Sequence, residues 1–477
     1  MRPVEIIFFL LLLFTMGTLF SPSDQKRFFW KTILLTVVAG VAQWVVEGYR
    51  WQIVPGYGFL LVLTLISFRP PRKLPLKILL SLFLIIAILP SMLLPVIELP
   101  TPTGPHSVGT HTYHWIDHNR QEWFTNEDFR DARQLMVQIW YPAIPEEDRK
   151  PAPYFDHPDY RGPALASAGN FPAFSLTYQH LTKTHSYTDA PVNDGGQFPV
   201  LILSHGLVGT RFLHTSLIEE LVSHGYVVAA LNHPYDANIS VFPDGSTADY
   251  RSHIGPEVAY EDSVLLRRRQ LNTRVEDIRF ILDQMEQIQS GNIKSMLSGH
   301  LDLDKIGMLG HSFGGATSVE VAARDTRIKA CLVLDSWSLA VADSIIKRGL
   351  EQPLLYMGRP TWPDNRNDLL IRSLINNNSG PAYYLTLEGT HHFDYTDIPL
   401  FSPFLNYIGK AGEIPGRRII EIVNRLTVRF FDIYLLGIDT DRDAQPPGQR
   451  LDYGDHPLSL FFRRHGACVP VGRSRAA

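Results

Sequence analysis

Ser312 lies in the segment Gly310-His-Ser-Phe-Gly-Gly315, which has the Gly-x-Ser-x-Gly spacing of a nucleophile elbow. The apolar run from Lys305 to Leu309 is typical of a strand, and helical periodicity begins near Ala316. A sharp turn between such a strand and helix needs glycine on both sides, and it leaves the serine hydroxyl exposed. A serine hydroxyl next to a base can attack an ester carbonyl. The sequence therefore predicts that Ser312 is a catalytic nucleophile.

The base for this serine is expected among the histidines that follow it, because this kind of site carries serine, acid and histidine in that chain order. His391 and His392 come directly after a predicted strand, Tyr383 to Leu387. His456 and His465 lie in a polar tail. Either histidine of the adjacent pair could reach Ser312, and the spacing leaves that choice open.

Two aspartates are candidates for the carboxylate that orients the histidine. Asp335 ends the predicted strand Lys329 to Leu334, and Asp364 follows the next predicted strand, Pro353 to Met357. In folds with a nucleophile elbow, the acid more commonly lies after the strand that precedes Asp364. Spacing alone does not decide between the two.

The oxyanion that forms on the carbonyl needs two backbone N–H donors, one of them from the residue after the nucleophile. Phe313 supplies the first donor. The second is expected from a loop that follows an earlier strand, and Ser204-His-Gly-Leu-Val-Gly209 comes after the predicted strand Pro199 to Ser204. We therefore predict that Leu207 and Phe313 form the oxyanion hole.

Short apolar runs alternate with amphipathic stretches from about residue 104 onward. Such alternation predicts an α/β domain with a largely parallel sheet covered by helices on both faces, and ligands at the carboxyl ends of its strands. Besides the strands named above, two more are expected at Leu135 to Tyr141 and Tyr226 to Leu231. Helices are expected at Thr215 to Ser223, Val264 to Ile288, Ala316 to Ala323 and Arg417 to Leu436.

The first hundred residues hold four apolar runs, at Ile6 to Phe20, Phe28 to Val46, Trp51 to Phe68 and Ile78 to Ile97. A membrane span needs about 17 to 25 residues. Any single run could instead be a buried helix or a signal peptide, but four in succession with charges between them favour a multi-pass membrane section. No small-residue cleavage pattern follows Phe20. We therefore expect about four transmembrane helices.

Basic residues between the runs predict the orientation of these spans. Seven lie in or next to the first and third gaps, against two on the opposite side. The seven are Lys26, Arg27, Lys31, Arg69, Arg72, Lys73 and Lys77, and the two are Arg2 and Arg50. The two gaps are therefore expected in the cytoplasm. The N-terminus and everything after Ile97 are then expected on the exoplasmic face, extracellular or periplasmic.

With these motifs the chain resembles the plasma-type platelet-activating-factor acetylhydrolase family of α/β-hydrolases. The resemblance covers about 70% of the chain, from Gly104 to Gly437. It rests on five segments: Thr103 to Gly109, Ser204 to Leu207, Ser223 to Ala230, Gly310 to Ala316 and Leu334 to Trp337. The sequence departs from the plasma enzymes in its apolar N-terminal section and in Asp-Ser-Trp where they read Asp-Ala-Trp.

The resemblance implies a choice among the open candidates. In the family the acid follows the strand after the nucleophile helix, which selects Asp335, and the histidine lies three residues after a glycine, which selects His392. The family's oxyanion donors fall on Leu207 and Phe313. It also implies hydrolysis of a short sn-2 acyl chain on a phospholipid similar to platelet-activating factor.

We predict a membrane-anchored serine esterase that acts without metal or organic cofactor on a phospholipid or small ester. An alternative is a carboxylesterase for soluble short-chain esters or polyesters, and an alternative of another class is an inactive hydrolase fold that serves as a binding module. The predicted parts are a membrane section at 1–98, a linker at 99–105, the α/β-hydrolase domain at 106–440 and a polar tail at 441–477.

Charge and the remaining motifs narrow the class of protein further. Residues 1–97 carry nine basic and three acidic residues, whereas the rest carries 35 and 45, which argues against a nucleic-acid partner. Two cysteines argue against a disulfide scaffold and a thiolate zinc cluster. The triplet Asp439, Asp441 and Asp443 lacks the glycine and glutamate of a calcium loop. The run Arg267 to Arg269 predicts a solvated helix face or, less favoured, a contact with anionic headgroups.

Overall fold

The computed structural model describes residues 1–20, 26–68, 74–125, 131–144, 149–255 and 257–438 of the chain. The chain divides into two compact units. The helical unit consists of Met1–Glu98, Pro153–Lys183 and Leu400–Leu405, and the sheet unit consists of Leu99–Ala152, Thr184–Pro399 and the chain from Asn406 onward. The predicted boundaries at residues 98, 105 and 440 stay a prediction.

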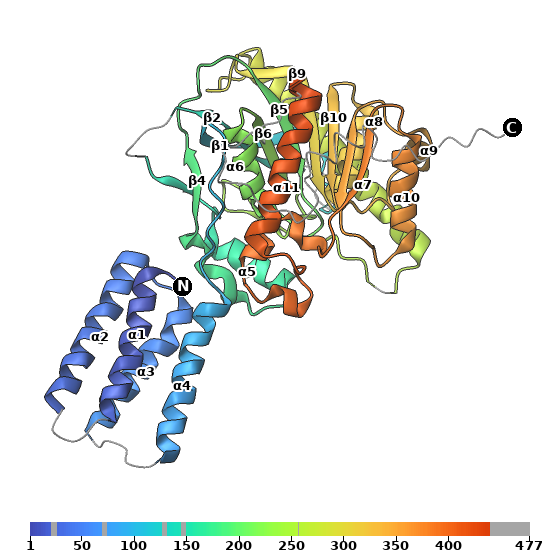
Figure 1. The fold of residues 1–477 in the computed structure, drawn as a ribbon. Helices are drawn as coiled ribbons and strands as arrows, with labels where there is room; N and C mark the ends of the chain where they lie inside the picture. The colour runs from blue at the N-terminus through green and yellow to red at the C-terminus, as the bar shows by residue number, and fades with distance from the viewer. Residues whose placement is uncertain (21–25, 69–73, 126–130, 145–148, 256, 439–477) are drawn as a thin grey trace. The chain divides into compact units, whose positions relative to one another are not determined.

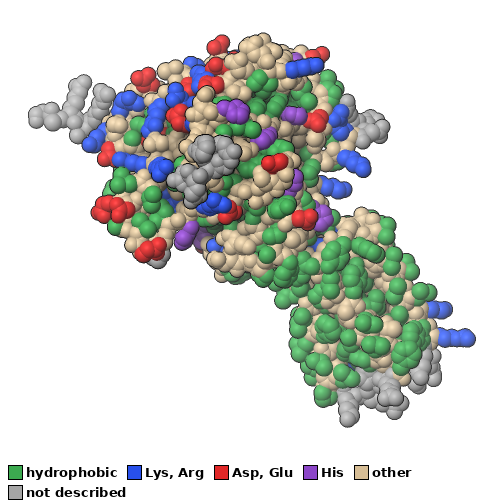
Figure 2. Space-filling view, turned by 180° about the vertical axis from the view of Figure 1, so that it is seen from behind, with side chains coloured by type: hydrophobic (Ala, Val, Ile, Leu, Met, Phe, Trp, Pro, Cys, Tyr) green, Lys and Arg blue, Asp and Glu red, His purple; other side chains and the backbone are tan. Residues whose placement is uncertain are grey.

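Four helices build the N-terminal part of the helical unit: α1 (Pro3–Leu19), α2 (Lys26–Glu47), α3 (Val54–Ser67) and α4 (Leu74–Leu93). They lie side by side (Figure 1), and their outer surface is largely hydrophobic (Figure 2). Leu10, Leu34, Val45 and Leu61 are among the exposed apolar side chains. Inside the unit, Arg50 and Glu5 form a buried ion pair at 2.6 Å.

All four predicted apolar runs are helical, but only two of these helices exceed the lower limit of about 17 residues for a span. Arg27–Glu47 and Pro75–Leu93 are long and apolar enough to cross a membrane, whereas Pro3–Leu19 and Trp51–Ser67 are shorter. A 17-residue helix rises about 26 Å, which is less than the roughly 30 Å of a bilayer core. The expectation of four spans is therefore not supported beyond two candidate helices. Arg69, Arg72 and Lys73, which carried much of the orientation argument, lie outside the described residues, as do the tail at 441–477 and the triplet at Asp439.

The helical unit also contains an insertion that the sequence analysis placed within the hydrolase domain. It holds α5 (Pro158–Ala168) and the 3-10 helix η3 (Ala173–Leu181). The Trp51 indole donates a hydrogen bond to the Ser175 carbonyl at 3.3 Å, and the Tyr178 hydroxyl donates to the Pro95 carbonyl at 3.1 Å. These contacts join the insertion to the N-terminal helices.

The sheet unit is built on a ten-stranded sheet in the order β12-β11-β10-β9-β5-β6-β2-β1-β4-β3. The strands from β12 to β6 are parallel, and β2 is antiparallel to both β6 and β1. A separate hairpin pairs β7 with β8. The strands are β1 (Ser107–Gln121), β2 (Ala132–Ala143), β3 (Pro151–Pro153), β4 (Lys183–Thr188), β5 (Phe198–Ser204), β6 (Val227–Asn232), β7 (Ile239–Val241), β8 (Thr247–Asp249), β9 (Leu301–His311), β10 (Ile328–Leu334), β11 (Leu354–Gly358) and β12 (Ala382–Thr386).

Helices cover both faces of this sheet because successive strand residues point to opposite sides. In β5, Val200 and Ile202 pack in one core, and Leu201 and Leu203 pack in the other. The first core is covered by α7 (Tyr260–Gln289), α8 (Phe313–Arg324), α9 (Asp343–Arg348) and α10 (Asn365–Asn377). The second is covered by α6 (Thr215–Ser223) and α11 (Gly416–Phe431), which crosses in front of the sheet in Figure 1. The predicted mostly parallel sheet between two helical layers is confirmed.

Candidate active site

Ser312 occupies the sharp turn between β9 and α8, with the positive φ of 56° and ψ of −120°. Such a backbone conformation is rare for a residue with a side chain, and strain of this kind occurs at functional turns. The neighbouring glycines leave room for the turn: a Cβ on Gly310 would meet the Gly314 carbonyl, and a Cβ on Gly314 would meet the Ser204 carbonyl. The serine at the elbow therefore stands where the spacing predicts it.

The structure brings the three predicted side chains together. His392 Nε2 lies 3.0 Å from Ser312 Oγ, and His392 Nδ1 lies 2.5 Å from Asp335 Oδ2. His392 opens the short helix η5 (His392–Tyr395), which follows β12, and Asp335 follows β10. The three groups thus come from the carboxyl ends of three strands of the parallel sheet.

Asp335 is fully buried, and its carboxylate has several further partners. It accepts hydrogen bonds from the Arg359 backbone N–H at 3.1 Å and from the Tyr356 hydroxyl at 3.3 Å, and it forms an ion pair with the Arg359 guanidinium at 3.2 Å. A buried carboxylate with such partners is held in one orientation. It therefore holds the His392 ring in one orientation as well.

The two residues that spacing left as alternatives lie elsewhere. Asp364 caps the N-terminus of α10, where it accepts a hydrogen bond from the Arg366 backbone and pairs with the Arg366 guanidinium. His391 is exposed, and its backbone N–H donates to Asp394. The structure therefore brings neither of them into the Ser312, His392 and Asp335 group.

The two predicted oxyanion donors come from different elements. Phe313 is the first residue of α8, and the first N–H groups of a helix have no acceptor within that helix. Leu207 lies in the loop 204–209 after β5, where Val208 N–H donates to the Asp236 carbonyl at 2.9 Å. Gly206 in this loop approaches Ser312 so closely that a Cβ on it would lie 3.0 Å from the Ser312 Cβ. The loop therefore lies against Ser312.

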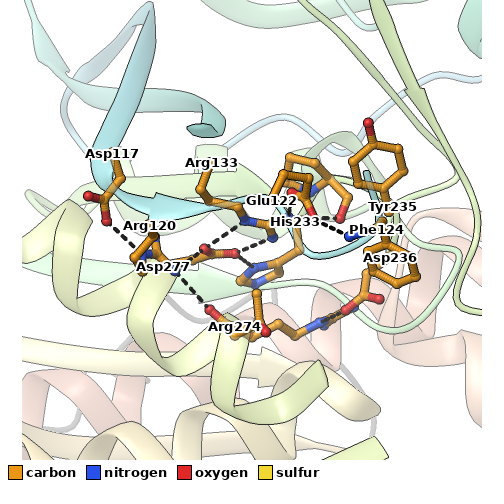
Figure 3. Close-up of polar contacts among 12 residues, drawn as sticks. Asp117, Arg120, Glu122, Phe124, Arg133, His233, Tyr235, Asp236, Arg274 and Asp277 are labelled. Atoms are coloured by element: carbon orange, nitrogen blue, oxygen red, sulfur yellow. Dashed lines mark hydrogen bonds and ion pairs between the residues drawn. The ribbon is translucent and has the colours of Figure 1, made fainter. Parts of the chain in front are cut away.

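A buried polar network, partly drawn in Figure 3, contacts this loop and was not predicted from the sequence. Arg274 donates to the His205 carbonyl and to Asp236, both at 2.6 Å. Ser204 Oγ lies 3.0 Å from His233 Nε2, and His233 Nδ1 lies 2.8 Å from Asp277. Burial, reinforced by the Arg274 charge, lowers the pKa of His233 to about 4. The available signal was a polar pair three residues apart on the apolar face of a predicted helix, Arg274 and Asp277.

Within the described residues, no group of three or more His, Cys, Asp or Glu side chains could hold a metal ion. Three histidines lie close together in the sequence of β1. Two of them have other partners, since His111 pairs with Asp189 and His114 contacts Gln134.

Residues 94–448 match the family model described as platelet-activating factor acetylhydrolase, isoform II. The chain belongs to this family. It is therefore a carboxylic ester hydrolase, and the resemblance seen in its motifs is confirmed.

Relatives of this acetylhydrolase family and a solved esterase structure agree with that assignment. The chain is 24% identical to the platelet-activating factor acetylhydrolase of Gallus gallus, over 71% of this chain and 84% of the relative. It is 28% identical to a probable 1-alkyl-2-acetylglycerophosphocholine esterase of Arthroderma benhamiae, over 72% and 89%. The structure of a ferulic acid esterase from Streptomyces cinnamoneus matches with a TM-score of 0.60 and 25% identity, over 74% and 97%. The predicted α/β-hydrolase fold is therefore supported by a solved neighbour.

Proposed function

We propose that this chain is a membrane-anchored serine esterase in which Ser312, His392 and Asp335 form the catalytic triad. The observation that carries the proposal is the continuous hydrogen-bonded path from Asp335 through His392 to Ser312, with distances of 2.5 and 3.0 Å. Such a path is what a weak hydroxyl nucleophile requires. It also argues against an inactive binding module.

In the first half of the reaction, Ser312 Oγ forms a bond to the ester carbonyl carbon while its proton moves to His392 Nε2. Asp335 stabilises the imidazolium and holds the ring so that Nδ1 keeps its proton. The tetrahedral oxyanion accepts hydrogen bonds from the Leu207 and Phe313 N–H groups. Cleavage of the C–O bond then releases the alcohol, which takes the proton from His392 Nε2.

In the second half, water attacks the acyl-enzyme and loses a proton to His392, and that proton returns to Ser312 Oγ as the acid leaves. The Arg274 contact with the His205 carbonyl supports the 204–209 loop during both steps. We regard Arg274 as a positioning residue, since it contacts the loop and not the substrate.

The proposed substrate is the short sn-2 acyl ester of a phospholipid similar to platelet-activating factor. The names of the relatives from Gallus gallus and Arthroderma benhamiae support this choice. A screen of the detergent-solubilised chain on acetyl, butyryl and palmitoyl esters, each with and without a phosphocholine headgroup, tests it. We expect acetyl esters with the headgroup to be hydrolysed fastest. Faster turnover of palmitoyl phospholipids would contradict the proposal.

A second candidate substrate class is the soluble short-chain ester, and the solved ferulic acid esterase favours it. The same screen separates the two classes, because a soluble esterase gains nothing from the headgroup. Equal kcat/KM for acetyl esters with and without phosphocholine would favour this alternative.

We further propose that the helical unit anchors the enzyme in a membrane, with the sheet unit on the exoplasmic face. The two long apolar helices and the exposed hydrophobic side chains of the unit support anchoring. The basic residues between the apolar runs support the orientation. The number of spans is proposed as four, with α1 and α3 as the shorter pair.

A further inference from the structure

The sheet unit has a second polar site, a surface hollow of about 570 Å³ between the end of β1, the start of β2 and α7. It contains none of the proposed catalytic residues. We propose that this hollow binds a phosphate group. The residues that carry the proposal are Arg120, Trp123, Arg268 and Arg269, which all line the hollow.

Three buried N–H donors of these side chains have no acceptor among the described residues: Arg120 Nη2, Trp123 Nε1 and Arg268 Nε. Buried donors without acceptors are costly and therefore uncommon, and each needs an explanation such as a bound water or ion. Three in one hollow, with no buried unpaired acceptor atom among the described side chains that line it, indicate a ligand that supplies several oxygen acceptors.

The charged side chains that line the hollow are mostly positive, as the binding of an anion requires. Four arginines line the hollow, Arg133 being the fourth, against one carboxylate, Glu276, which lies 3.3 Å from Arg279. Arg269 stacks on the Trp123 ring at 4.3 Å and has no carboxylate partner among the described residues. Its charge is therefore available to a ligand.

Carboxylates pair with three of these arginines and neutralise part of this charge, and Figure 3 draws Asp117, Glu122 and Asp277 among them. Arg120 pairs with Asp117 and Asp277, and Arg133 pairs with Asp277 and Glu122. Arg268 uses Nη2 to bind Asp343 at 2.7 Å, which leaves Nε free. These ion pairs hold the guanidinium groups in place. Their free N–H groups therefore already lie at the hollow before a ligand binds.

Phosphate is the class of ligand that these N–H donors fit. Guanidinium N–H groups bind phosphate oxygens with strong charge-assisted hydrogen bonds, and a phosphate offers several acceptors in different directions. The hollow is larger than a phosphate ion, so the group could be free or part of a headgroup. Inorganic phosphate and glycerol 3-phosphate, which carries the phosphomonoester of a lipid without acyl chains, distinguish these sources.

The experiment is a calorimetric titration of the detergent-solubilised full chain with each of the two compounds at low ionic strength. We expect saturable binding, weakened at least about tenfold in a double variant Arg268→Gln/Arg269→Gln, since two charge-assisted contacts are lost. Trp123→Phe, which keeps most of the ring that stacks on Arg269, should weaken binding several-fold. Arg417→Gln removes an exposed arginine outside the hollow and serves as the matched control, with no change in affinity.

Tighter binding of glycerol 3-phosphate than of phosphate would support a lipid headgroup, and the reverse would support a free anion. Equal affinity in the wild-type chain and in the Arg268→Gln/Arg269→Gln variant would overturn the proposal. Glu127 and Asp128 follow Trp123 in the sequence and lie outside the described residues, so a Glu127→Gln/Asp128→Asn variant is also titrated. Binding that appears only in that variant would show that the chain's own acids fill the hollow, and would overturn the proposal as well.

Discussion

Among single residues, the position of Asp335 decides which carboxylate can orient His392. We predict that Asp335→Asn lowers kcat by roughly 10⁴-fold, because the wrong histidine tautomer is then favoured. Asp364→Asn, at a half-buried helix cap, should cost less than about tenfold. Steady-state kinetics on a short acyl ester measure both. A loss with Asp364→Asn as large as with Asp335→Asn would contradict the assignment of the acid.

At this scale the sequence predicted the nucleophile better than its partners. The elbow around Ser312 is a local pattern, so spacing was enough to find it. The choice between His391 and His392, and between Asp335 and Asp364, depends on how three strand ends meet, which spacing does not contain. The motifs shared with a family made that choice, and the structure brings the same side chains together.

At the scale of elements, α7 supports the site through two buried charges, Arg274 and Asp277. We predict that Asp277→Asn lowers the free energy of unfolding by about 3 to 5 kcal/mol, because Arg133 then loses the carboxylate to which it makes two hydrogen bonds. A decrease in Tm, measured by scanning calorimetry or fluorimetry, tests this. Asp283→Asn, at an exposed position on the same helix, is the control and should change Tm little. Equal Tm values for the two variants would contradict a supporting role.

Elements with strong periodicity were predicted well, and the others were missed. The helix predicted at Thr215 to Ser223 has these same bounds in α6, and each predicted strand of the parallel sheet is present. β1 was missed because its polar and aromatic residues lack an apolar run, and pairing with β2 stabilises it instead. α5 and η3 were missed because both helices are short and carry little periodic signal, and α5 also has an internal proline.

At the scale of the whole molecule, buried neutral histidines predict a pH dependence of stability. Burial, as the largest cause, lowers the pKa of His214 and His233 to about 4, and it lowers the pKa of His205 and His311 well below the ordinary value. Between about pH 6.5 and 4 the unfolded chain binds protons that the folded chain does not. The contribution of these histidines to the free energy of unfolding is therefore fully present above pH 6.5 and is lost as the pH falls below it.

The measurement is Tm between pH 8 and 4.5. We expect a plateau above pH 6.5 and a steady fall below it. His214→Asn should reduce the slope, whereas His253→Asn, at an exposed position, should not. A Tm that stays constant from pH 7 to pH 4.5 would contradict the burial of neutral histidines.

Membrane orientation is also a property of the whole chain, and labelling at three positions tests it. Single cysteines beside Arg2, Arg72 and Gly104, in a background without Cys331 and Cys468, are labelled with a membrane-impermeant reagent in intact cells. We expect labelling at Arg2 and Gly104 but not at Arg72, because basic loops stay inside. An unlabelled Arg2 site would show that α1 is not a span. Labelling at Arg72 but not at Gly104 would contradict the orientation.

The central claim is that Ser312 is the nucleophile of an esterase. The most direct test treats the solubilised chain with a serine-reactive fluorophosphonate, follows esterase activity, and locates the adduct by peptide mass spectrometry. We expect one phosphonyl adduct, on Ser312, that forms in parallel with loss of activity and is absent from Ser312→Ala. An adduct on another residue, or full inhibition with Ser312 unmodified, would contradict it.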